Sequence, residues 1–129
     1  MTIAWLLEDE RSDAVDKVLR HVMDNGALVP SIWRLEVANM LRVAVRRGRC
    51  DEATVDRAID MFIDLPIAID EETDLHAWNS TLALARAEGL TLYDAAYLEL
   101  AKRRRLPLAT LDRDLVAAAT KQDVPIFTL

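Results

Sequence analysis

Short apolar runs alternate with longer amphipathic stretches along this chain, and this alternation restricts its fold more than any other feature. The runs are three or four residues long and most border a Gly or Pro, so we expect strands at 27–29, 67–69, 108–110 and 124–127. Apolar residues recur at helical spacing between them, and we expect helices over 13–25, 31–47, 51–65, 72–88, 91–104 and 112–121. The alternation predicts an α/β fold with a short, mostly parallel sheet flanked by helices.

The length and composition indicate a single domain spanning residues 1–129. The chain has a mass of 14.5 kDa and is 52% hydrophobic and 29% charged, which provides enough apolar side chains for a core and excludes a disordered chain. It contains no internal repeat and no linker-like segment. We therefore expect one continuous core.

Several classes of protein are excluded by what the chain contains. Its longest stretch without a formal charge is the eleven residues Leu75–Ala85, well short of the roughly 20 apolar residues that span a bilayer. The first residues lack the basic region of a secretory signal, and the single Cys50 cannot form an internal disulfide. We therefore expect a cytoplasmic protein that does not associate with membranes.

The charge distribution leaves nucleic acid open as a ligand. The net charge is −6, which by itself disfavours binding to a polyanion. However, basic residues gather in two clusters, which comprise Arg42, Arg46, Arg47 and Arg49 in one case and Lys102, Arg103, Arg104 and Arg105 in the other. Local patches of this kind can hold a phosphate backbone. Their alternative role is to cover the solvated ends of helices.

Three acidic residues stand near the starts of predicted helices, where we expect a strand to pass into a helix: Glu36, Asp94 and Asp112. Ligands of open parallel sheets bind outside the carboxyl ends of the strands, so these side chains are expected to converge. Two carboxylates 4 Å apart repel each other by about 4 kcal/mol at an effective dielectric constant of 20. A cluster would therefore need a divalent cation, and oxygen ligands suit Mg²⁺ or Mn²⁺.

Purely structural roles are open for the same residues. Thr91 and Asp94 have the spacing of a helix capping box, and Asp112 stands where an N-cap would stand. Asp114 would then complement the helix dipole, and Glu36 would be an exposed helix residue. Spacing alone does not distinguish these roles from metal binding.

Three segments together resemble one family of nucleases. The segments PSIWRLEVANML (30–41), LTLYDAAYLELA (90–101) and LATLDRDL (108–115) are similar to PIN-domain ribonucleases, and specifically to toxins of the VapC type. The resemblance extends over nearly the whole chain. It implies a three-layer PIN-like fold and a Mg²⁺-dependent endoribonuclease, with Mn²⁺ as an alternative ion. It also implies a homodimer that is neutralised by a VapB-type antitoxin.

The resemblance also assigns roles to residues by position. The catalytic, metal-binding acids are Glu36, Asp94 and Asp112, and Asp114 is an auxiliary metal ligand. Polar residues beside them, Thr110 and Asn39, match positions close to the substrate. These roles are expectations from the resemblance.

One departure concerns the start of the chain. The family begins with a strand that ends in a catalytic Asp, followed by a helix like that expected over 1–7, and Met1 falls just after this Asp. The sequence therefore predicts a domain that lacks its first strand, with weak or absent nuclease activity and a compensating dimer contact. Three alternatives stay open: a PIN-like module that binds its antitoxin or itself without catalysis, a nuclease acting on DNA, and a structural α/β protein whose acids lie apart.

Overall fold

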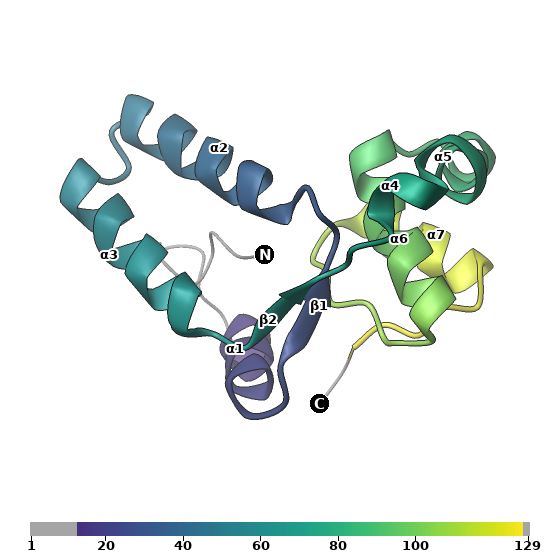
Figure 1. Cartoon of the computed structure of the whole chain (residues 1–129), viewed down its shortest axis with the longest axis horizontal. Helices are drawn as coiled ribbons and strands as arrows, with labels where there is room; N and C mark the ends of the chain where they lie inside the picture. Colours follow the sequence, from purple (N-terminus) through teal and green to yellow (C-terminus); the bar gives the residue numbers. More distant parts are fainter. Residues whose placement is uncertain (1–12, 128–129) are drawn as a thin grey trace. The chain divides into compact units, whose positions relative to one another are not determined.

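The computed structural model describes residues 13–127, which group into two units (Figure 1). The first unit comprises residues 13–28 and 32–68, and the second comprises 29–31 and 69–127. The helix expected over 1–7 lies outside the described residues.

The first unit contains three amphipathic helices: α1 (Asp13–Asn25), α2 (Trp33–Arg46) and α3 (Glu52–Asp64). Asp51 caps α3, because its Oδ1 accepts a hydrogen bond from the Thr54 backbone N–H at 2.8 Å. Near the start of α2 and the end of α3, the rings of Trp33 and Phe62 meet edge to face, with centroids 6.3 Å apart. Both aromatic side chains are buried, so they anchor the two helices in a small apolar core.

Two short strands, β1 (Ala27–Val29) and β2 (Ile67–Ile69), pair with each other in parallel, as predicted. The Ala27 N–H donates to the Pro66 carbonyl at 3.1 Å, and the Asp70 N–H donates to the Val29 carbonyl at 2.8 Å. Gly26 joins α1 to β1 with a left-handed φ of +82°. A Cβ atom at this position would lie 2.9 Å from the Pro66 oxygen, so the close approach of the strands requires glycine here.

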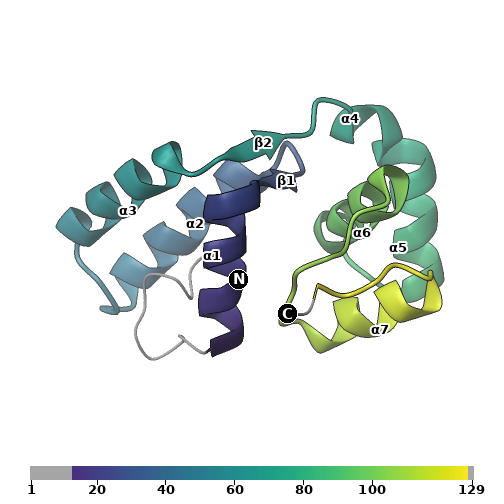
Figure 2. The ribbon, with the colours of Figure 1, turned by 90° about the horizontal axis from the view of Figure 1, so that it is seen from below.

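The second unit consists of α4 (Thr73–His76), a π-helical turn η3 (Ala77–Thr81), α5 (Leu82–Glu88), α6 (Leu92–Arg104) and α7 (Arg113–Lys121). The π-helical turn interrupts the helix that the sequence predicts as continuous over 72–88. Figure 2 shows α5, α6 and α7 gathered around one another. Their core is built largely from alanine and leucine, including Ala95, Leu98, Leu115 and Ala119.

The third and fourth predicted strands are much reduced. At 108–110 and 124–127 the structure has a single parallel bridge between Leu108 and Ile126, so the prediction of full strands there is wrong. The Leu108 N–H donates to the Pro125 carbonyl at 2.9 Å, and the Phe127 N–H donates to the Leu108 carbonyl at 2.8 Å. Pro125 has no N–H to extend a ladder, which keeps this pairing short.

No helix among residues 13–127 combines the length and the apolar character needed to cross a membrane.

Candidate active site

Asp94 lies in the first turn of α6, where Thr91 caps the helix. The Thr91 Oγ1 accepts from the Asp94 backbone N–H at 3.1 Å, and the hydroxyl also hydrogen-bonds the Asp94 carboxylate. This is the capping arrangement predicted as the structural alternative. The expectation of a strand before Asp94 is wrong: Gly89 ends α5 in the left-handed region at φ +64°, and only two residues separate it from α6.

Asp112 caps α7 in the same way. Its Oδ1 accepts hydrogen bonds from the backbone N–H groups of Asp114 at 2.8 Å and Leu115 at 3.2 Å. The Thr110 Oγ1 in turn accepts from the Asp112 N–H at 3.1 Å, which fixes the loop that leads into the helix. Capping engages only one carboxylate oxygen, so it leaves the Asp112 Oδ2 available for a further ligand.

The carboxylates at these two helix starts repel one another. Burial raises the pKa of Asp94, and the negative charges of Asp112 and Asp114 raise it further. The hydrogen bond with Thr91 opposes this shift without reversing it. Asp94 therefore lies close enough to Asp112 and Asp114 for their charges to interact, and the convergence of Glu36, Asp94 and Asp112 on one metal ion stays a prediction.

The remaining predicted site residues, Glu36 and Asn39, lie on α2 in the first unit. Glu36 is in the first turn and half-buried, so its alternative description as an exposed residue is not correct. Asn39 is exposed one turn later. Within residues 13–127 no three His, Cys, Asp or Glu side chains are arranged so that they could hold one metal ion together.

A second acidic group in the same unit is paired with an arginine. Asp70, directly after β2, accepts from the Arg103 Nη2 at 2.7 Å and Nη1 at 3.2 Å, while the Arg103 Nε donates to the Glu99 Oε2 at 2.9 Å. Both carboxylates are buried, with 3% and 6% of their side chains exposed. This ion-pair network is structural, because Arg103 is committed to both acids.

The network extends to the loop that follows β2. The Thr73 hydroxyl donates to the Asp70 Oδ2 at 2.9 Å, and the Thr73 Oγ1 accepts from the Ser31 backbone N–H at 3.1 Å. The hydrogen bonds from Arg103 hold the pKa of Asp70 below its usual value despite burial. The network thus links the ends of both strands to the last turns of α6.

This network corrects the sequence-based view of the second basic cluster. Arg103 binds Asp70 and Glu99, and the Lys102 Nζ donates to the Gln122 side chain at 2.8 Å, so neither extends freely toward a phosphate backbone. Of the two ion pairs, the sequence indicates only the one between Glu99 and Arg103, which are four residues apart on one helix. Asp70, 33 residues before Arg103, has no such local signal.

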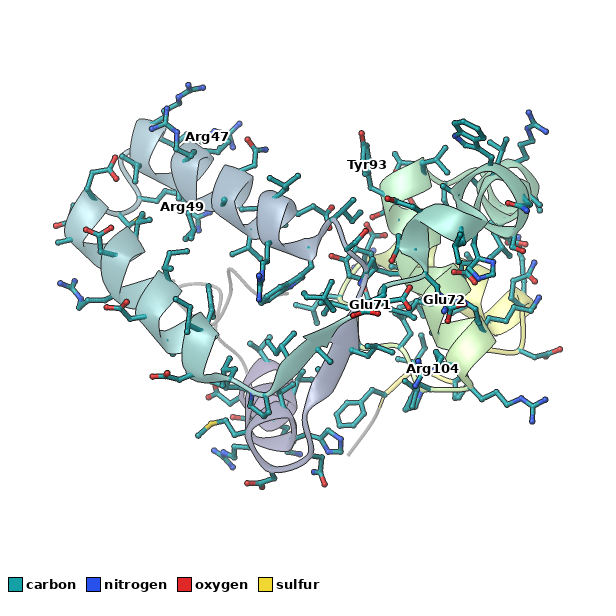
Figure 3. The ribbon with its side chains drawn as sticks, viewed as in Figure 1. Arg47, Arg49, Glu71, Glu72, Tyr93 and Arg104 are labelled. Atoms are coloured by element: carbon teal, nitrogen blue, oxygen red, sulfur yellow. The ribbon has the colours of Figure 1, made fainter. Side chains whose placement is uncertain are left out.

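The first basic cluster stays exposed at the end of α2. Figure 3 shows Arg47 and Arg49 near this end of the helix. A cavity of about 210 Å³ opens beside them, and it is lined by Asn39, Met40, Val43, Ala44, Arg47 and Arg49.

Comparisons with known proteins identify what this chain resembles. The model of the PIN domain family matches residues 2–121. Two curated relatives from Pyrobaculum aerophilum are similar over most of their length: Ribonuclease VapC3, 30% identical over 87% of this chain and 84% of its own, and Exonuclease VapC9, 32% identical over 88% and 80%. The crystal structure of PAE2754 from the same organism superposes with a TM-score of 0.63 at 29% identity, covering 81% of this chain and 76% of its own.

Proposed function

The chain belongs to the PIN-domain family and is of the VapC type, and from this premise we propose that it is a divalent-metal-dependent endoribonuclease. The observation that carries the proposal is the placement of Asp94 and Asp112 at the starts of two helices that pack together, where burial, and then the charges of Asp112 and Asp114, raise the pKa of Asp94. The charges that act on the Asp94 carboxylate are those of Asp112 and Asp114, whereas Asp70 in the same unit is bound by Arg103. We take residues 1–129 as one PIN domain, since the family match spans both units.

The donor set fits a hard cation such as Mg²⁺ or Mn²⁺, because all its ligating atoms are carboxylate oxygens. Asp94 and Asp112 would hold the ion, with Asp114 as an auxiliary ligand, and the family resemblance adds Glu36 as a further ligand. When bound, the cation activates water for attack on the scissile phosphate and offsets the charge that develops there.

The chain's own residues orient this site. Two backbone N–H groups of α7 hold the Asp112 Oδ1, so its Oδ2 is directed by the helix start. Thr110 accepts from the Asp112 N–H through its oxygen, which leaves the hydroxyl proton free to donate to a phosphate oxygen. Asn39 would offer its side-chain amide to the substrate from α2. The exposed arginines at the end of α2 would bind the RNA backbone.

We further propose a VapB-type antitoxin and a second copy of this chain as partners, both acting in the cytoplasm. The VapC names of the relatives support the antitoxin. Exposed apolar side chains in the first unit support a protein partner as well: Leu35 on α2 is 76% exposed, and Ile63 on α3 is 73% exposed. Apolar side chains left uncovered to this extent often mark an interaction surface.

A second candidate function is a PIN module that binds its partners without catalysis. It is favoured by one observation, namely that no three metal-ligating side chains in residues 13–127 form a single ligand set. The two candidates differ in what a divalent cation does. Only the nuclease requires a cation to bind at Asp94 and Asp112.

Calorimetric titration of Mn²⁺ into the chain and into Asp94→Asn tests the proposal. We expect binding by the unaltered chain, its loss in Asp94→Asn, and its retention in the control Asp123→Asn, which removes an exposed acid two residues after α7. Absence of binding by the unaltered chain would refute the nuclease and favour the binding module.

A circular RNA distinguishes the mode of cleavage. An endonuclease opens the circle, whereas an exonuclease needs an end and cleaves only the linear form. A circular single-stranded DNA of matching sequence tests the alternative of a DNA nuclease. Opening of circular RNA in Mn²⁺, with no opening by Asp94→Asn, is the expected result.

A further inference from the structure

Large apolar side chains are left exposed directly beside the acids. Tyr93, the residue before Asp94, is 61% exposed, and Leu111, the residue before Asp112, is 56% exposed. Leu92, at the first position of α6, is 39% exposed. In Figure 3 the Tyr93 side chain extends away from the start of α6. Leu92, Tyr93 and Leu111 thus form an apolar rim beside the acidic group. Exposed apolar side chains gathered in this way often mark a binding site.

Tyr93 is exposed although its neighbours in the chain are packed. Ala95 in the first turn of α6 and Leu98 in the second belong to the core of the second unit, and Leu90, before the helix, packs against it. Tyr97, one turn after Tyr93, packs against the same core. The Tyr93 side chain itself is 61% exposed, so its ring is accessible to a ligand.

An unpaired nucleobase matches this surface in chemistry. The faces of the base are uncharged and stack on aromatic rings, so they can approach Tyr93 without adding negative charge beside Asp94. The phosphate of the same nucleotide carries the charge, and it would lie toward the carboxylates and their cation. Bases within a duplex are stacked on each other and cannot use such a ring.

We propose that Tyr93 is a specificity-determining residue that stacks on an unpaired base next to the phosphate to be cleaved, with Leu111 beside it. This inference rests on the proposed function, since it assigns a substrate contact to the same site. Two other occupants of the rim are a helix of another protein and a second copy of the chain. Only for a nucleobase does removal of the Tyr93 ring weaken RNA binding.

RNA binding measured by fluorescence anisotropy tests the proposal. The probe is a short unstructured RNA in Ca²⁺, used as an oxygen-seeking cation in place of Mg²⁺. We expect Tyr93→Ala to weaken binding by roughly tenfold to a hundredfold, the range of one base–aromatic stack. Tyr93→Phe keeps the ring and should bind within about twofold of the unaltered chain. The control Trp78→Ala, which removes a 92% exposed aromatic from η3, should bind normally.

A spectroscopic readout separates stacking from a merely structural role. A single 2-aminopurine base in the RNA loses fluorescence when it stacks, so quenching should occur with the unaltered chain and with Tyr93→Phe but not with Tyr93→Ala. Unchanged RNA affinity in Tyr93→Ala would overturn the inference, as would an equal loss in Trp78→Ala. A change of molecular mass in Tyr93→Ala by light scattering would also overturn it and identify a second copy as the occupant.

The two proposals fail in different ways. Mn²⁺ binding that is lost in Asp94→Asn, without any effect of Tyr93→Ala on RNA, would overturn the stacking inference and leave the nuclease proposal standing. Failure of the unaltered chain to bind Mn²⁺ refutes the nuclease. Failure to bind RNA as well overturns both.

Discussion

Replacement of Arg103 by leucine is expected to destabilise the protein strongly, because it leaves two buried carboxylates without their cation. In the structure the guanidinium donates to both oxygens of Asp70, at 2.7 and 3.2 Å, and to Glu99 through Nε and Nη2, at 2.9 and 3.0 Å. Asp70 would keep only its contacts with Thr73 and the Glu72 N–H. The same guanidinium thus bridges the Glu99 and Asp70 carboxylates.

The magnitude follows from the burial of the three side chains. Arg103 is 17% exposed, and the two carboxylates are 3% and 6% exposed, so solvent screens the interaction little. Removing one partner of a buried ion pair typically costs about 3–5 kcal/mol. We expect this loss in the free energy of unfolding, which for a domain of this size lowers Tm by roughly 10–20 °C. Arg103→Lys keeps the charge but not the fork geometry, so its loss should be intermediate.

The loss should also depend on pH. The pKa of Asp70 is depressed in the folded protein, so its ion pair contributes stability above the usual value of 3.8, and this contribution falls as the pH drops toward the folded pKa. In Arg103→Leu the Asp70 carboxylate is desolvated without its cation, so its pKa rises and it binds a proton readily. The difference between the two proteins should therefore be largest at neutral pH and should shrink toward pH 4.

Urea denaturation followed by circular dichroism, at neutral pH and near pH 4, measures both effects. Arg104→Leu is the matched control, because Arg104 is the next residue of α6 and is exposed (Figure 3). Its free energy of unfolding should change by less than about 0.5 kcal/mol. A loss below about 1 kcal/mol in Arg103→Leu, or a loss that does not change with pH, would refute the reasoning.

Three further predictions concern the acids and the core. Asp94→Asn should raise Tm in the absence of metal, and increasingly as the pH rises through the raised pKa of Asp94; differential scanning fluorimetry with and without Mn²⁺ checks this, while RNA cleavage should fall about a hundredfold or more. Asp112→Asn should retain the cap of α7 and lose cleavage, whereas Asp112→Ala should lose about 1 kcal/mol of stability as well; equal stability of the two in urea contradicts this. Leu98→Ala, at a fully buried position of α6, should cost about 2–5 kcal/mol by the same denaturation measurement, and a smaller loss would show that the core closes around the gap.

The sequence alone determined the features that depend on near neighbours in the chain. The helices end within a few residues of the predicted positions because their signals are local: Gly26 and Gly89 at left-handed turns, and side-chain caps at Thr91 and Asp112. The structural and the metal-binding interpretations of Asp112 both place this acid at the start of α7. The helix needs a single oxygen of that acid, so the local pattern could not distinguish between them.

The tertiary structure decided what depends on residues far apart in the sequence. Arg103 belongs to a basic cluster that is visible in the sequence, but in the structure it binds Asp70, 33 positions away. A buried carboxylate is stable only when packing places a cation beside it. The charge of Asp94 lies near those of Asp112 and Asp114 because α6 and α7 pack together. Hydrogen bonds between residues a few positions apart can be predicted from the sequence. Long-range electrostatics depends on which helix ends the core brings together.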